Sequence, residues 1–206
     1  MTSAPVIPRA AVRGTAIGVL FMAFFGTLWA GIGIGGLQGA GMPWTLIVFV
    51  ASAFLLVCGI ALLRSAKRLP AGMTPENARR GKRIWKWFGI VFGLEGAMIG
   101  AASGICGATD HFELFFPIMA IIVGAHFFPL APLFQVRLYY GTGALLCLLG
   151  AATLLFVPEE ASYDGHQIVV WWTVVGFGSA LILWGTGLFV WLNGIRWLRK
   201  TGPLSK

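Results

Sequence analysis

One acidic residue of this 206-residue chain lies deep inside an apolar stretch, and it is the side chain best placed to do chemistry. Glu95 is about nine residues into that stretch, which is roughly 14 Å at the rise of an α-helix. An ionised carboxylate in hydrocarbon costs several kcal/mol, so Glu95 must be neutral, paired or in contact with a watery cavity. We interpret it as a candidate proton-relay residue. The alternative is a protonated carboxyl that bonds a neighbouring carbonyl and only holds helices together.

His126 is the natural partner of Glu95. It lies in segment 124–132, toward the end of the next apolar stretch, and antiparallel packing of the two stretches would bring it within a turn or two of Glu95. Pro129 and Pro132 cannot donate backbone hydrogen bonds, so the carbonyls four residues earlier are free to accept from another polar group. The pair predicts a proton relay. The alternative is a histidine that bonds one of these freed carbonyls.

A second polar cluster consists of Asp110, His111 and Glu113, at the start of another apolar stretch. Asp110 can cap a helix there, because acids are favoured at the positive end of the helix dipole. As a metal site the cluster would need further ligands, and the other outer loop offers Glu159, Asp164 and His166. Short spacing alone is weak support for metal binding. We therefore predict no metal site, no cofactor and no nucleophilic catalytic motif.

These residues belong to a very apolar chain. The hydrophobic fraction is 58%, the charged fraction is 11% and the mean hydropathy is +0.84. A water-soluble chain of this length cannot hide so much apolar surface, which excludes a soluble globular domain. The sequence pI of about 10.0 therefore does not indicate a nucleic-acid partner. The positive charge has to be interpreted loop by loop instead.

Six apolar runs divide the chain, and each is about 18–24 residues long, enough to cross a hydrocarbon core of roughly 30 Å. Backbone groups in lipid must bond within their own segment, so the runs are predicted to be helices. The expected fold class is all-α, a single integral membrane bundle of six transmembrane helices over residues 1–206. The spans are expected at about 14–37, 43–63, 85–104, 113–130, 138–157 and 168–191, with a basic loop at 64–84.

Every lysine and arginine falls on one side of this six-span arrangement. They precede the first span, follow the last, and occupy the loops between spans two and three and between spans four and five. The opposite loops hold acids and no cation. Because positive loops stay in the cytoplasm, both termini are predicted to be cytoplasmic. A five- or seven-span arrangement would scatter the charge over both faces.

Five cations lie beside two tryptophans at the end of the basic loop: Arg79, Arg80, Lys82, Arg83 and Lys86. Such residues suit the headgroup level, where each cation gains about 1 kcal/mol from anionic lipid. We expect this segment to contact the lipid bilayer, with anionic headgroups as candidate partners. The alternative is a topology signal with an aromatic anchor. Thr74 and Pro75 predict that a helix begins here and continues into the third span.

Small residues form a stripe on the first and third predicted helices. The stripe on the third consists of Gly89, Gly93, Ala97, Gly100 and Gly104. Stripes of this kind let another helix approach closely, in the same chain, a second copy or a partner subunit. Residues 25–33 also resemble 92–100, and 59–66 loosely match 124–131. This weak repeat suggests three parallel helical hairpins, unless the small residues match by chance.

The stretch Gly124–Gly143 contains His-Phe-Phe-Pro-Leu-Ala followed by Arg-Leu-Tyr-Tyr-Gly-Thr-Gly. It resembles small six-span bacterial inner-membrane proteins over about one helix and a loop. The resemblance implies a bacterial inner-membrane location and no particular activity. The leading hypothesis is a small transport or proton-coupled membrane protein that uses Glu95 and His126. The alternatives are a structural or interaction subunit of a membrane complex, and an intramembrane enzyme built on the same pair and the outer cluster.

Overall fold

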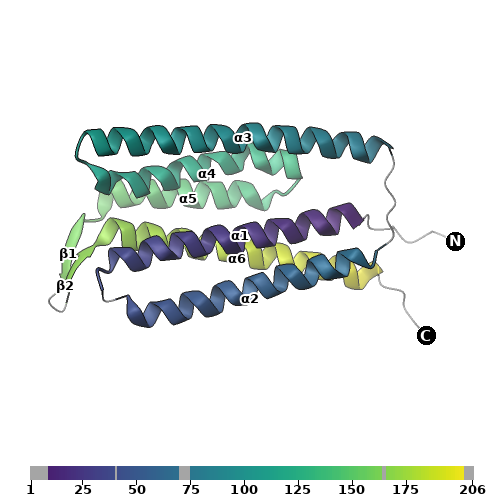
Figure 1. The fold of residues 1–206 in the computed structure, drawn as a ribbon, viewed down its shortest axis with the longest axis horizontal. Coiled ribbons are helices and arrows are strands. Elements are labelled where there is room, and N and C mark those ends of the chain that lie inside the picture. The colour runs from purple at the N-terminus through teal and green to yellow at the C-terminus, as the bar shows by residue number, and fades with distance from the viewer. Residues whose placement is uncertain (1–8, 40, 70–74, 164–165, 202–206) are drawn as a thin grey trace.

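Six long helices run side by side in the part of the chain that the structure describes, which is residues 9–39, 41–69, 75–163 and 166–201 (Figure 1). The structure is a computed structural model. The helices are α1 (Arg9–Gly36), α2 (Met42–Lys67), α3 (Pro75–Ala108), α4 (Phe115–Phe134), α5 (Leu138–Phe156) and α6 (Val170–Thr201). A short 3-10 helix, η1 (Phe112–Leu114), precedes α4. An antiparallel hairpin of β1 (Glu160–Tyr163) and β2 (His166–Val169) precedes α6.

All six helices are long and apolar enough to cross a membrane. The predicted all-α fold is therefore confirmed, and the chain has the architecture of a multi-pass membrane protein. The predicted helix start at Pro75 is also confirmed, while Thr74 and the neighbouring loop residues 70–73 lie outside the described residues. Residues 168 and 169, which the sequence assigns to the sixth span, belong to β2 instead, since the hairpin pairs them with residues 161 and 160.

The helices form two groups of three. Helices α1, α2 and α6 make one group, and α3, α4 and α5 make the other (Figure 1). The most extensive packing is between α1 and α6 and between α4 and α5. Helix α6 also contacts α4 and α5, and Thr142 of α5 shares a 2.8 Å hydrogen bond with Thr186 of α6. Helix α6 therefore joins the two groups.

The small-residue stripe on α1 consists of Gly14, Gly18, Gly26, Ala30 and Gly33, and it packs closely against α6 at Gly26 and Gly33. Ala30 is fully buried, and a Cβ added at Gly33 would lie 2.9 Å from the ring of Phe177. A Cβ added at Gly176 of α6 would collide with the backbone of Gly33. The two backbones come this close because neither helix carries a side chain at the crossing. The expectation of a packing surface is confirmed for this stripe.

The stripe on α3 faces away from the other helices. A Cβ at Gly89, Gly93, Gly100 or Gly104 would meet no atom within 4 Å. The opposite face of α3 packs against the bundle, through Ile84, Phe88, Val91, Glu95, Ile99, Ala102 and Cys106. Residues two apart lie about 200° apart around a helix, so the stripe cannot share that face. No described residue of this chain covers it.

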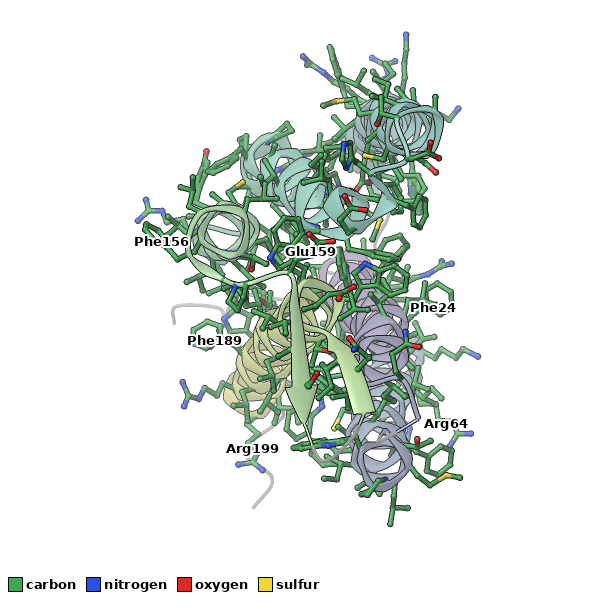
Figure 2. The ribbon with its side chains drawn as sticks, turned by 90° about the vertical axis from the view of Figure 1, so that its left-hand side faces the viewer. Phe24, Arg64, Phe156, Glu159, Phe189 and Arg199 are labelled. Carbon is green, nitrogen blue, oxygen red and sulfur yellow. The ribbon has the colours of Figure 1, made fainter. Side chains whose placement is uncertain are left out.

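Large apolar side chains point outward around the whole bundle. Phe24, Phe156 and Phe189 are more than half exposed, and Figure 2 shows them projecting from α1, α5 and α6. Exposed aromatic rings at this density would leave a soluble protein prone to aggregate, whereas hydrocarbon solvates them. The lipid bilayer is therefore the medium that this surface contacts.

Charged side chains gather at opposite ends of the bundle. Helices α1, α3 and α5 begin, and α2, α4 and α6 end, at one end (Figure 1), which we call the cationic end. Its described cations are Arg9, Arg13, Arg64, Lys67, Arg68, Arg79, Arg80, Lys82, Arg83, Lys86, Arg137, Arg196 and Arg199. The acidic end carries Asp110, Glu113, Glu159 and Glu160, beside the hairpin. The cytoplasmic position of the cationic end and the hairpin repeat stay predictions.

Candidate functional site

Glu95 on α3 and His126 on α4 meet between the two helices. Oε1 of Glu95 lies 3.3 Å from Nδ1 of His126, and the side chains are only 8% and 10% exposed. The structure thus confirms that the two side chains are close. Among residues 79–108, Glu95 and Cys106 are the only buried ones, so the acid is a principal point of attachment for α3.

The local sequence explains how both helices present these side chains. Glu95 occupies the central position of the α3 face that packs against the bundle, whose members follow one another at intervals of three or four residues. Helix α4 continues through Pro129 and Pro132 to Phe134, and the next residue, Gln135, has a left-handed φ of 58°. Membrane helices tolerate such prolines because neighbouring groups satisfy the freed carbonyls. His126 therefore stays on a regular helix facing α3.

The nearest backbone contact of His126 differs from the one that the sequence suggested. Nδ1 lies 3.2 Å from the carbonyl oxygen of Val123, one turn earlier. The carbonyls of Ala125 and Phe128, which the two prolines free, are not its partners in the described structure. Both neighbours of Nδ1 are oxygen atoms, so a hydrogen on Nδ1 can be donated to the carbonyl while the ring still contacts the carboxyl group.

The other ring nitrogen of His126 has an unused bonding position. Nε2 is buried and has no hydrogen-bond partner among the described residues. An unsatisfied buried polar atom costs about 1–3 kcal/mol, and the described structure has three others, on Trp172, Ser179 and Trp184. An imidazole ring with one committed nitrogen and one open nitrogen can gain or lose a proton at the open one. The buried pair therefore consists of a carboxyl group in contact with an imidazole ring that has one open nitrogen.

The outer cluster is exposed and does not assemble into a larger site. Nδ1 of His111 lies 2.8 Å from Oε1 of Glu113, and the two side chains are 64% and 24% exposed. Asp110 has a left-handed φ of 57° after the end of α3, and it does not cap a helix, because His111 is the N-cap of η1. Within the described residues no three His, Cys, Asp or Glu side chains form a metal-ligand group. Asp164 and the side chain of His166 lie outside the described part of the chain.

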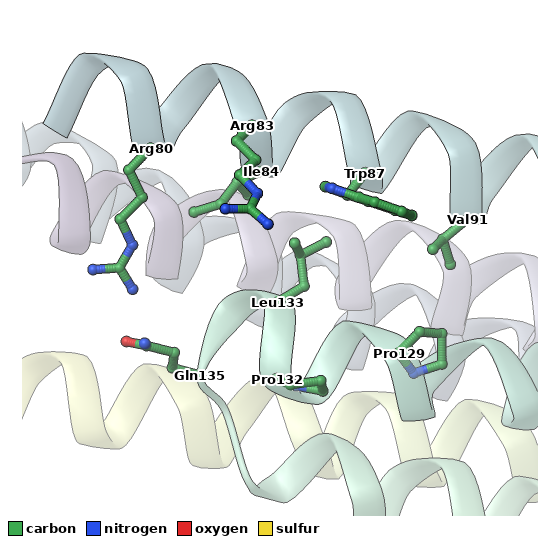
Figure 3. Close-up of a pocket in the computed structure, with 9 residues that line it drawn as sticks. All are labelled: Arg80, Arg83, Ile84, Trp87, Val91, Pro129, Pro132, Leu133 and Gln135. Carbon is green, nitrogen blue, oxygen red and sulfur yellow. The ribbon is translucent and has the colours of Figure 1, made fainter. Parts of the chain in front are cut away.

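A cleft of about 650 Å³ opens between α3 and α4 at the cationic end (Figure 3). Its lining residues are Arg80, Arg83, Ile84, Trp87, Val91, Pro129, Pro132, Leu133 and Gln135. Of the five cations that the sequence groups together, only Arg80 and Arg83 line it; Arg79, Lys82 and Lys86 do not. Val91 and Pro129 mark its inner part, one helical turn from Glu95 and His126.

Sequence reasoning missed Gln135 and the proline face of α4 as parts of this cleft. The sequence does show two prolines three residues apart near the end of this helix. Proline side chains are compact rings, so they leave room beside the helix face that carries them. That the cleft lies between α3 and α4 depends on how the two helices pack, which no local pattern determines.

Comparison of the chain with protein-family models, with curated proteins and with solved structures gives no significant match. The class of protein is therefore defined by the fold and the site alone. It is a six-helix multi-pass membrane protein with a buried carboxyl–imidazole pair and a cationic cleft one helical turn away.

Proposed function

We propose that this protein is a small transport or proton-coupled membrane protein in which Glu95 and His126 exchange a proton. The observation that carries the proposal is the 3.3 Å contact between two ionisable side chains that are both about nine-tenths buried. Ionisable groups inside a membrane are costly, and they generally mark ion or proton paths. The unpartnered Nε2 of His126 supports the same function, because a proton relay needs an atom that can bind a proton and release it again.

Access to the pair is proposed from the cationic end through the α3–α4 cleft. The inner part of the cleft lies one turn from both side chains, which is a distance that one or two water molecules can bridge. Helix α3 is the element expected to move, because it buries fewer residues than any other helix. A displacement of α3 would expose Glu95 and His126 to the acidic end of the bundle. The pair would then be accessible from each side of the membrane in turn.

The proposed setting is a bacterial inner membrane with the cationic end in the cytoplasm. The gathering of all described cations at one end supports this orientation through the positive-inside rule. The resemblance of residues 124–143 to small bacterial inner-membrane proteins supports the location.

The test is proton flux into liposomes that contain the purified protein, under an imposed pH gradient and membrane potential. We expect flux with the wild type and a fall to the level of protein-free liposomes with Glu95→Gln, because the amide keeps the shape and hydrogen bonding but cannot exchange a proton. Glu113→Gln is the matched control, since it removes an exposed carboxylate at the acidic end. That variant should keep the wild-type flux.

Equal absence of flux in the wild type and in Glu95→Gln, with equal thermal stability, would contradict the proposal. A second function would then lead, that of an interaction subunit in a membrane complex. The open glycine face of α3 favours it, because nothing in the described chain packs there and glycine faces suit close helix contacts.

A further inference from the structure

We propose that the α3–α4 cleft binds a lipid with an anionic phosphate headgroup. In this site the phosphate lies against Arg80 and Arg83, and the apolar part of the lipid follows the inner lining of the cleft. The inference goes beyond the proton-exchange proposal but concerns the same cleft, so a bound lipid would exclude the water that we propose to reach Glu95 and His126 there. Lipid binding is measured without proton flux, so the two proposals can fail separately.

The charges of the cleft favour an anion. Arg80 and Arg83 are one turn apart on the same helix face, and Figure 3 shows both side chains reaching from α3 toward α4. The lining contains no carboxylate, and the described side chains give neither guanidinium an ion-pair partner. Two like charges side by side repel each other, and a shared anion removes that repulsion. The forked N–H groups of arginine match phosphate oxygens, which they bind two at a time.

Gln135 adds a neutral donor on the opposite wall. It ends α4 in a left-handed conformation, and its backbone N–H donates to the carbonyl of Ala131. Its side-chain amide makes no hydrogen bond with the described residues and points toward Arg80 (Figure 3). The outer part of the cleft thus combines two guanidinium groups, which only donate hydrogen bonds, with an amide whose NH2 group can also donate. This composition favours a group that accepts hydrogen bonds, as phosphate diesters do.

The inner lining distinguishes a lipid from a free anion. Beyond the arginines the walls are formed by Ile84, Trp87 and Leu133, followed by Val91 and Pro129. These side chains offer an inorganic phosphate nothing to bind, and the cleft is much larger than such an ion. An acyl chain gains from the same walls by burying its methylene groups. Basic pockets between transmembrane helices at the headgroup level are known to recognise lipid phosphates by this combination.

The test uses the purified full-length chain in a neutral detergent. A phosphatidylglycerol with a fluorescent acyl chain is titrated against the protein, and its dissociation constant is measured by fluorescence anisotropy. Phosphatidylcholine with the same chain is the reference for headgroup charge. We expect the wild type to bind the anionic lipid more tightly than the zwitterionic one.

Two double variants separate the site from diffuse attraction. Arg80→Gln with Arg83→Gln removes both cations that line the cleft. Arg79→Gln with Lys82→Gln removes the same charge from the same turns of α3 without touching the lining. Both double variants lose the same amount of long-range attraction to the anionic lipid. Only the first variant also loses the direct hydrogen bonds to the phosphate. Its dissociation constant should therefore rise at least about tenfold above that of the second. All four residues are exposed, so both variants are expected to fold.

The aromatic wall provides an independent readout. Trp87→Ala should weaken lipid binding, whereas Trp85→Ala should not, because Trp85 is equally close to the headgroup level but does not line the cleft. Excess inorganic phosphate should leave the lipid bound. Equal losses from the two double variants would overturn the proposal in favour of diffuse attraction. Displacement of the lipid by inorganic phosphate would overturn it in favour of a soluble-anion site.

Discussion

Glu95 is buried because it lies on the face of α3 that packs against the bundle. Nothing in the neighbouring sequence favours a polar residue at this position. Glu95 occupies a position at which an apolar side chain would pack without cost, between Val91 and Ile99 on the same helix face. Among the described residues, the polar contact of this carboxyl group is with His126. A buried pair of this kind is seldom more stable than a pair of apolar residues, although removing just one partner is costly. Stability alone therefore does not explain the presence of the pair.

A double-mutant cycle measures that balance. We expect His126→Leu alone to lower the free energy of unfolding by about 1–3 kcal/mol, because the carboxyl of Glu95 then loses its partner. Glu95→Leu alone should cost a similar amount. The double variant should recover most of both losses, with a coupling of at least about 1 kcal/mol, because two leucines fill the space without a polar group. The measurement is denaturant unfolding in mixed micelles. Additive losses would show that the two side chains do not interact.

The pair was partly predictable at this scale. An acid inside an apolar run is visible in any hydropathy pattern, and His126 is the one histidine that lies within such a run. The contact of Nδ1 with the carbonyl of Val123 and the open position at Nε2 were not predictable. Both depend on the rotation of the imidazole ring, which the packing of α3 against α4 determines.

Two helices with similar glycine patterns have opposite environments. The stripe on α1 lies against α6, where a Cβ at Gly176 would collide with the backbone of Gly33. The stripe on α3, which includes Gly93, has no described neighbour within 4 Å. A stripe of small residues shows only that another helix could pack closely against that backbone. Whether another helix approaches depends on the side chains of the other face, and on α3 those already pack against the bundle.

Matched glycine substitutions test this difference between the two elements. Gly176→Ala should lower the free energy of unfolding by about 1–3 kcal/mol, because the added methyl group forces α1 and α6 apart. Gly93→Ala should change it by less than about 1 kcal/mol, the size of the propensity difference between the two residues in a helix. Thermal unfolding in the same detergent gives both values. A loss at Gly93 as large as that at Gly176 would indicate that a second chain packs on α3.

The six helices were predictable as elements, whereas their ends were predictable only where a local signal marks them. Backbone groups in hydrocarbon must bond within a helix, so each apolar run long enough to cross had one available structure. That constraint disappears at the water interface. The proline at the first position of α3 predicted its start at Pro75, but no local signal predicted the hairpin at Glu160–Tyr163 and His166–Val169.

At the scale of the whole molecule, charge and hydropathy together give the bundle a direction. Six helices of alternating direction bring four cation-bearing segments to one end, although they are far apart in the sequence. The cleft with Arg80 and Arg83 belongs to that end, and the exposed pair of His111 and Glu113 belongs to the other. A membrane potential that is negative inside favours the cationic end in the cytoplasm, because moving one charge across 100 mV is worth about 2.3 kcal/mol.

Labelling in whole bacterial cells tests this orientation. The three natural cysteines are replaced by alanine, and single cysteines are introduced as Lys82→Cys at the cationic end and Glu160→Cys at the acidic end, two exposed positions. A membrane-impermeant maleimide should label the cysteine at position 160 in intact cells and leave the one at position 82 unlabelled. Permeabilised cells, in which both label, confirm that each thiol is reactive. Labelling at position 82 in intact cells would contradict the predicted orientation, and the α3–α4 cleft would then open to the outside of the cell.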